Sequence, residues 1–211
     1  FALLAGVVSS AMITMHGGAY LAHRTEGVIQ ARAVKGAVGA AIIMVVAFMA
    51  AGVWLQVIDG YRITSLVDTA ALPDILSKTV VREPGAWMAN YERYPLLWLL
   101  PVLGLGGAVA AAFLLMVRRT LSAFVASSLA VIGVISTAGV SMFPFIMPSS
   151  TMPAASLTVW DSVSSHLSLA IMFWATLIFM PLIVIYTSWA YRVMSGKVTV
   201  AQIKANEHSA Y

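Results

Sequence analysis

The 211-residue chain is far more apolar than a soluble domain, because 61% of its residues are hydrophobic and only 9% are charged. Soluble domains carry about 25% charged residues, so the composition excludes a soluble globular fold. Its net charge of +4 comes from basic residues scattered at the ends of apolar segments, which favours membrane topology over a nucleic-acid partner. The lack of cysteine excludes a disulfide framework and a thiolate metal site.

Five apolar segments are long enough to cross a bilayer, which takes roughly 20 residues. None of them contains Asp, Glu, Lys or Arg. They predict an all-α, polytopic transmembrane bundle in a single domain that spans residues 1–211. The predicted helices cover 1–22, 36–58, 95–117, 121–143 and 167–191.

The first two predicted helices are joined by a basic loop over 22–35. Gly36 and Gly39 open the second helix, and we expect them to let a neighbouring helix approach closely. Residues 59–94 form the longest polar segment and predict an extramembrane loop. Within it, Asp59 and Gly60 predict a turn, and residues 72–81 predict a short helix.

The third helix contains Pro101 and a cluster of three glycines, which favours a kink and tight packing. Only Arg118 and Arg119 separate it from the fourth helix, so these two helices must be antiparallel neighbours. The last helix holds Pro181 near its middle and is followed by a polar tail, 192–211.

The segment 144–166 predicts a structured cap between the last two helices, because prolines interrupt helix there. Asp161 and the serines after it are suited to cap the first turn of the last helix. Asp161 is alternatively a proton entry or exit point, or a charge at a subunit contact. The methionines and aromatic residues of 142–160 predict packing, with a quinone or oxygen route as the alternative.

The orientation follows from the basic residues. Eight Lys and Arg residues fall on the side of the 22–35 loop, the 118–119 connection and the tail, whereas four fall in 59–94. Short basic loops favour the cytoplasm. We therefore expect a cytoplasmic C-terminus, with the 59–94 loop and the cap facing outward.

His16 is the one readily titrated residue within a membrane segment, so it is the candidate for cofactor contact. Three roles are open for His16. It could form a hydrogen bond with a neighbouring helix, take part in proton transfer or quinone contact, or ligate a metal or heme. His166 begins the last helix, where we expect a capping or surface role. His23 and His208 lie in polar segments and are expected to be solvated. No catalytic motif and no paired-histidine metal spacing is present.

Several segments carry a resemblance to a known family. They read MFPFIMPSS (142–150), SLTVWDSVSSHLSL (156–169), PLIVIYTSWAYRVMSGKVT (181–199), AGVWLQVIDGY (51–61), VVREPGAW (80–87) and HGGAYLAHRTEG (16–27). Together they resemble the C-terminal part of subunit II of cytochrome bd ubiquinol oxidases. The resemblance covers essentially the whole chain, and it implies that an N-terminal portion of about four helices is missing.

The resemblance implies a role in an enzyme of the bacterial inner membrane that passes electrons from quinol to O2 through hemes b and d. In that family the heme-bearing subunit I ligates the hemes, and subunit II stabilises it. The resemblance leaves open whether this chain binds a quinone, shapes a proton or oxygen path, or contacts a small accessory subunit. It also implies that no acidic proton-transfer position of the family falls within residues 1–211.

Two other classes remain open at the sequence level. Half of a secondary transporter or channel would use helices broken at Pro101, Pro181 or the Gly104–Gly107 cluster. A purely structural membrane subunit would affect assembly without affecting turnover.

Overall fold

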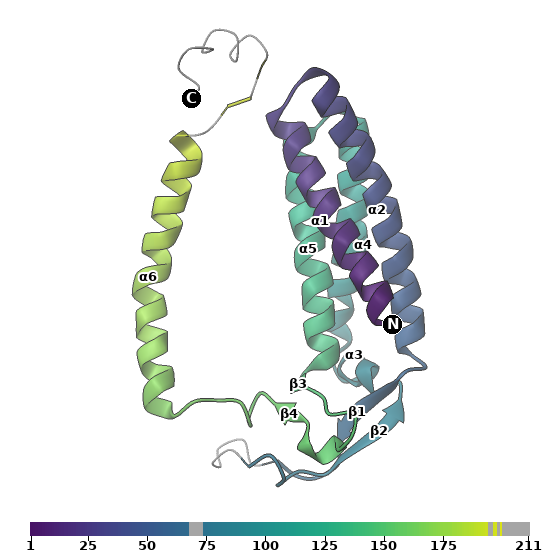
Figure 1. The fold of residues 1–211 in the computed structure, drawn as a ribbon, viewed down its shortest axis with the longest axis vertical. Coiled ribbons are helices and arrows are strands. Elements are labelled where there is room, and N and C mark those ends of the chain that lie inside the picture. The colour runs from purple at the N-terminus through teal and green to yellow at the C-terminus, as the bar shows by residue number, and fades with distance from the viewer. Residues whose placement is uncertain (68–73, 194–195, 198, 200–211) are drawn as a thin grey trace.

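The computed structural model describes residues 1–67, 74–193, 196, 197 and 199. Four helices form one bundle, and a fifth long helix stands apart from it (Figure 1). The bundle consists of α1 (Ala2–Arg24), α2 (Gly27–Leu55), α4 (Leu99–Met116) and α5 (Thr120–Met142), and the separate helix is α6 (His166–Val193). In the described part of the chain, five helical segments are long and apolar enough to span a membrane. The predicted all-α membrane fold is therefore confirmed.

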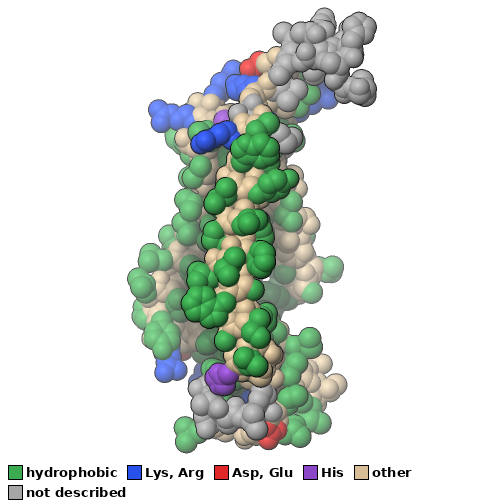
Figure 2. Space-filling model, turned by 90° about the vertical axis from the view of Figure 1, so that its left-hand side faces the viewer, with side chains coloured by type: hydrophobic (Ala, Val, Ile, Leu, Met, Phe, Trp, Pro, Cys, Tyr) green, Lys and Arg blue, Asp and Glu red, His purple; other side chains and the backbone are tan. Residues whose placement is uncertain are grey.

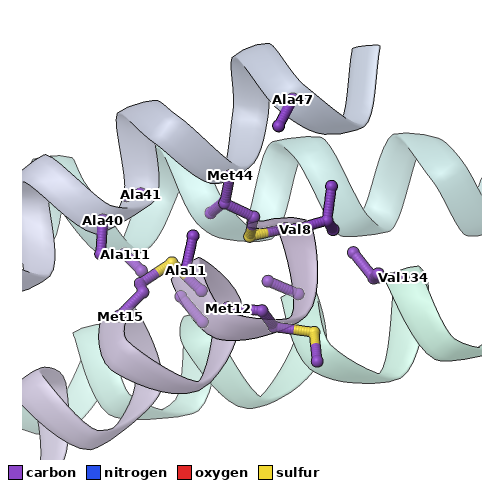
Figure 3. Close-up of a cluster of buried hydrophobic side chains, with 13 residues drawn as sticks. Val8, Ala11, Met12, Met15, Ala40, Ala41, Met44, Ala47, Ala111 and Val134 are labelled. Atoms are coloured by element: carbon purple, nitrogen blue, oxygen red, sulfur yellow. The ribbon is translucent and has the colours of Figure 1, made fainter. Parts of the chain in front are cut away.

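Small side chains dominate the centre of the bundle (Figure 3). Met15 and Met44 are fully buried there, surrounded by alanines from all four helices. Lipid chains are as apolar as leucine, so helices in a membrane associate through close packing rather than through the hydrophobic effect. Alanines allow that close packing, and the flexible methionines fill the remaining space.

Helices α4 and α5 are antiparallel neighbours, as the short connection of three residues between them requires. Arg118 closes the turn between them in a left-handed conformation with φ 61°. Glycines allow the closest approach: a Cβ on Gly107 would lie 2.8 Å from the Ala130 nitrogen and 2.9 Å from the Ala126 oxygen. Gly104 and Gly133 meet in the same seam, whereas a Cβ on Gly106 would meet nothing within 4 Å.

The predicted basic loop over 22–35 is mostly helical, because α2 begins at Gly27. Hydropathy marks where the membrane begins, whereas the residues after Gly27 are helix formers that continue α2 beyond that boundary. The side-chain amide of Gln30 donates to the Ala22 carbonyl at 2.9 Å and so pairs one of the last carbonyls of α1. Gly18 provides the close contact of α1 with α2, not Gly36 and Gly39, whose Cβ atoms would meet nothing within 4 Å.

Residues 59–67 and 74–94 form what we call the hairpin extension, at the end of the bundle where α2 ends (Figure 1). It comprises the antiparallel strands β1 (Asp59–Ile63) and β2 (Val80–Pro84), the 3-10 turn η1 (Ala86–Met88) and α3 (Ala89–Arg93). The 3-10 turn η2 (Pro95–Trp98) leads into α4.

Two local predictions in the hairpin extension are wrong. Asp59 and Gly60 belong to β1 rather than to a turn, and Asp59 Oδ2 lies 3.6 Å from Arg82 Nη2 on the opposite strand. The predicted helix over 72–81 does not form: 72 and 73 lie outside the described residues, 74–79 contain turns, and β2 begins at Val80. The β-branched run of Thr79, Val80 and Val81 favours a strand.

Residues 143–165, the cap segment, connect α5 to α6. Within it, β3 (Phe145–Met147) pairs antiparallel with β4 (Leu157–Thr158), and the 3-10 turn η3 (Pro153–Ala155) lies between them. Helix α6 then buries no residue against the rest of the chain. Figure 2 shows apolar side chains along its whole visible length.

Candidate functional site

The hairpin extension and the cap segment are joined by an aromatic cluster. The ring centroid of Tyr61 lies 5.6 Å from that of Trp87 and 5.9 Å from that of Phe145. Trp87 and Phe145 meet edge to face at 6.5 Å. The Tyr61 hydroxyl also donates to the Ser149 carbonyl at 3.1 Å. Two segments more than 80 residues apart are thereby held as one unit.

The end of α5 is bonded by two residues of α3. Asn90 Nδ2 donates to the carbonyls of Val140 and Phe143 at 2.8 and 2.6 Å. The Tyr91 hydroxyl donates to the Thr137 carbonyl at 2.9 Å. The Asn90 donor pairs carbonyls at the end of the helix, where intrahelical partners run out, and Tyr91 adds a bond to a carbonyl of the last full turns. Sequence reasoning missed both residues, because Asn and Tyr in a polar loop carry no signal of a distant partner.

A buried ion pair makes a second link between the same two segments. Lys78 Nζ lies 2.7 Å from Asp161 Oδ2, and the two side chains are 2% and 8% exposed. Lys78 Nζ also donates to the Ile75 carbonyl at 2.8 Å. Asp161 Oδ2 accepts two further hydrogen bonds, from the Thr158 backbone N–H at 2.8 Å and the Thr158 hydroxyl at 2.7 Å.

The surroundings keep Asp161 ionised. Burial on its own raises the pKa of a carboxyl group, but the hydrogen bonds from Lys78 and Thr158 and the Lys78 charge outweigh it, so the pKa of Asp161 is lowered. A carboxylate with a lowered pKa does not pick up protons near neutral pH. Its side chain is largely shielded from solvent, although the residue as a whole is partly exposed. This geometry gives Asp161 a structural contact between two segments, and proton entry or a subunit contact at Asp161 stays a prediction.

Asp161 does not cap α6, contrary to the sequence-based expectation. The helix begins at His166, and the Ser165 hydroxyl accepts a hydrogen bond from the Ser168 N–H at 3.3 Å. Asp161 instead turns back to Thr158, three residues before it, and to Lys78. His166 is exposed in the first turn of the helix.

His16 bonds the neighbouring helix α5. Its Nδ1 lies 2.9 Å from Ser127 Oγ, and its ring stacks on Phe124 with centroids 4.8 Å apart. The Ser127 hydroxyl donates its only hydrogen to the Phe124 carbonyl at 2.7 Å. With this arrangement the hydroxyl accepts from His16 in the tautomer protonated on Nδ1, whereas in the other tautomer the hydroxyl donates to Nδ1 instead. His23 lies beside Thr120, with 3.3 Å between Nδ1 and Oγ1, and His208 lies outside the described residues.

An apolar cavity of about 810 Å³ lies between the bundle and the hairpin extension. Helices α1, α2, α4 and α5 form its walls, and Trp87, Tyr91 and Pro148 line it from the hairpin extension and the cap segment. Its lining contains no charged residue and no histidine. A heme brings two acidic propionates and an iron that is ligated chiefly by His, Cys, Met or Tyr. The lining includes Met and Tyr side chains but no cationic side chain that could pair with the propionates, and its apolar character fits an uncharged molecule.

The Met and aromatic residues of 142–160 divide between packing, exposure and this cavity, and Met147 and Met152 are the most exposed of the methionines. Phe145 belongs to the aromatic cluster, and Phe143 meets Trp160 edge to face at 6.2 Å. Met142 contributes to the cavity lining. Among the described residues, no group of three or more His, Asp or Glu side chains is arranged to hold a metal ion.

Comparison with known proteins gives a consistent result. A family model described as "Cytochrome bd terminal oxidase subunit II" matches residues 1–194. "Cytochrome bd-I ubiquinol oxidase subunit 2" of Escherichia coli K12 is 45% identical over 212 residues, which cover 100% of this chain and 56% of that relative. "Probable cytochrome oxidase subunit 2" of Haemophilus influenzae is 41% identical over 211 residues, with the same coverage. The chain therefore spans about half the length of these curated relatives.

Proposed function

Because this chain belongs to the family of cytochrome bd terminal oxidase subunit II, we propose that it is the C-terminal part of such a subunit. The complete subunit supports electron transfer from a membrane quinol to O2, with formation of water and a proton gradient. Its partner is the heme-bearing subunit I, which binds hemes b and d. The observation that carries this proposal is the 45% identity to the Escherichia coli relative along the entire chain.

The architecture supports a stabilising role in a larger membrane enzyme. The four-helix bundle is closed by glycine and alanine contacts, and the apolar cavity beside the hairpin extension has no cationic side chain in its lining to pair with heme propionates. We propose that the electron-transfer groups lie on subunit I and that this chain fixes their protein surroundings. A small accessory membrane subunit is a further proposed partner.

A transporter half is not favoured. Such a protein would bind its substrate at helices interrupted in mid-membrane. Here α4 continues from Pro101 through Gly104 and Gly107, and α6 continues through Pro181. The positions where the sequence allowed a break are therefore helical.

We propose that the apolar cavity holds an uncharged quinone. Its volume of about 810 Å³ lies within the range of ligand sites, which is roughly 300–1,000 Å³. The few polar side chains in its lining, including Gln56 and Ser141, offer hydrogen bonds to a carbonyl group. Replacing Ala138, in the cavity wall, by Phe in the full-length protein is expected to lower the amount of quinone that co-purifies. An unchanged quinone content would exclude this cavity as the binding site.

We propose a multi-pass location in the bacterial inner membrane with a cytoplasmic C-terminus. The ends of α1, α4 and α6 and the beginnings of α2 and α5 lie at the end of the molecule where Figure 2 shows Lys and Arg side chains gathered. The hairpin extension lies at the opposite end. Support comes from this charge asymmetry, because positive residues favour the cytoplasmic side.

The proposed function is tested by purifying the tagged full-length protein from native membranes. We expect a heme-bearing partner to co-purify, together with quinol-dependent oxygen uptake that resists cyanide at levels that block heme–copper oxidases. A colourless preparation without a partner would contradict the proposed function, and flux assays in liposomes would then test the transporter alternative.

A further inference from the structure

A groove of about 720 Å³ runs along α1 and α2 on a side of the helix pair separate from the quinone cavity. Six of its lining residues define what we call the α1–α2 groove: Gly6, Ser10, Thr14, Lys35, Gly36 and Gly39. The groove shares no helix face with the glycine seam of α4 and α5. Nothing described so far uses it.

The glycines of the groove open it rather than bring helices together. A Cβ on Gly6, Gly36 or Gly39 would meet no atom within 4 Å, whereas a Cβ on Gly18 would lie 2.8 Å from the Ala37 Cβ. Gly18 therefore provides the helix contact, and the other three leave space at the surface. That space has the shape and apolarity to take a hydrocarbon chain.

A cation stands at one end of the groove. Lys35 is the lining residue of α2 closest to its first residue, and the apolar window begins directly after it, at Gly36. A lysine at this boundary places its ammonium at the depth of the lipid headgroups, with its stem along the helix. The groove continues from Lys35 toward Ile43, deeper into the apolar span.

The Lys35 ammonium has no anionic partner in the described part of the chain. Among the described residues, Lys35 forms no ion pair and no hydrogen bond. Arg32, one turn earlier on the same helix, likewise forms no ion pair with a carboxylate of residues 1–67 or 74–193. Glu26 is the only described acid at this end, and its Oε1 lies 3.5 Å from Lys197 Nζ.

We propose that the α1–α2 groove binds one anionic phospholipid, with an acyl chain along Gly36 and Gly39 and the headgroup phosphate on Lys35 and Arg32. The apolar groove and the unpaired cations at headgroup depth are the two complementary parts of such a ligand. An apolar helix could fill the groove, but it would leave the Lys35 and Arg32 side chains without an anionic partner. Free phosphate could pair with both cations, but it would leave the apolar groove unfilled.

The test uses native mass spectrometry of the full-length protein in its natural assembly, with phosphatidylglycerol or phosphatidylcholine of identical acyl chains added. Lys35→Gln removes the cation, and we expect its apparent affinity for phosphatidylglycerol to fall about fivefold with little change for phosphatidylcholine. Gly39→Leu fills the groove without a clash and should weaken retention of both lipids.

Two control variants separate the groove from general effects. Gly106→Leu adds the same side chain on α4, where a Cβ also meets nothing within 4 Å, and Arg93→Gln removes a cation near the opposite end. Both should bind phosphatidylglycerol as the unmodified protein does. Unchanged phosphatidylglycerol affinity in Lys35→Gln or in Gly39→Leu would overturn the proposal. Competition by inorganic phosphate, or a groove covered by a protein segment that excludes both lipids, would overturn it as well.

Discussion

Lys78 and Asp161 are 83 residues apart in sequence and form the most buried ion pair among the described residues. Each residue of this pair depends on the other, because either one alone would be an unpaired charge shielded from water. The hydroxyl and N–H of Thr158 complete the shell around the carboxylate. The pair thus fixes the cap segment to the hairpin extension at one defined position.

Replacing Lys78 by Met should loosen this contact strongly. Removal of one partner of a buried pair costs about 3–5 kcal/mol, because the remaining charge is left unpaired. We expect faster hydrogen exchange in both the hairpin extension and the cap segment of the full-length protein, measured by mass spectrometry. Arg62→Met is the matched control, because its partner Glu83 is 38% exposed and an exposed pair contributes less than about 1 kcal/mol. Equal effects of the two variants would contradict this assignment.

The same contact should be insensitive to pH until strongly acidic conditions. Because the pKa of Asp161 is lowered on folding, its stabilisation is fully present above the ordinary aspartate pKa of about 3.9 and is lost as pH falls through the lowered value. Exchange protection of the cap segment, compared with Asp161→Asn at each pH, should stay constant from pH 8 to about 5. A loss of protection near pH 6 would show that another group controls the contact.

His16 should be dispensable for turnover. Its hydrogen bond with Ser127 is worth about 1 kcal/mol, so His16→Leu should lower thermal stability slightly and leave quinol-dependent oxygen uptake per assembled complex within about twofold. Ser127→Ala removes the same hydrogen bond from the α5 side and serves as the control. A tenfold loss of uptake in His16→Leu alone would support a proton or quinone role instead.

At the scale of elements, the α4–α5 seam depends on shape more than on hydropathy. Gly107→Ala would force the Ala126 and Ala130 backbone away, and overpacking of this kind costs about 1–3 kcal/mol. The yield of monodisperse assembly and its midpoint temperature in detergent should both fall. Gly106→Ala, with open space around its Cβ, should change neither. Similar losses for both substitutions would show that the close contact at Gly107 is not the cause, because helix propensity alone favours alanine over glycine.

The elements that can be predicted from the sequence are those whose helical structure is required by the membrane. An apolar run must be helical in lipid because its backbone has no water to bond, so all five long helices are predictable. The extension of α2 back to Gly27 is not, because residues outside the membrane form helix for other reasons. The strand over 80–84 and the roles of Asn90 and Asp161 depend on partners from distant segments, which local patterns do not reveal.

At the scale of the whole molecule, the two ends of the bundle differ in charge and in structure. We expect Leu66→Cys, which is fully exposed in the hairpin extension, to react with a membrane-impermeant maleimide on intact cells. Val117→Cys, at the opposite end of α4, should react only after the membrane is permeabilised. Residues 1–211 contain no cysteine, so the unsubstituted full-length protein gives the background. The reverse labelling pattern would invert the proposed topology.

Helix α6 buries no residue on the bundle, and this has a consequence for how the chain tolerates change over evolution. Positions in the glycine seam are constrained by volume, so relatives should keep small residues at Gly104, Gly107 and Gly133. Positions on α6 are constrained within this chain only by apolarity, so its surface should drift freely among Leu, Ile, Val, Phe and Met. A stripe of α6 that fails to drift would mark the side on which another protein, rather than lipid, exerts selection.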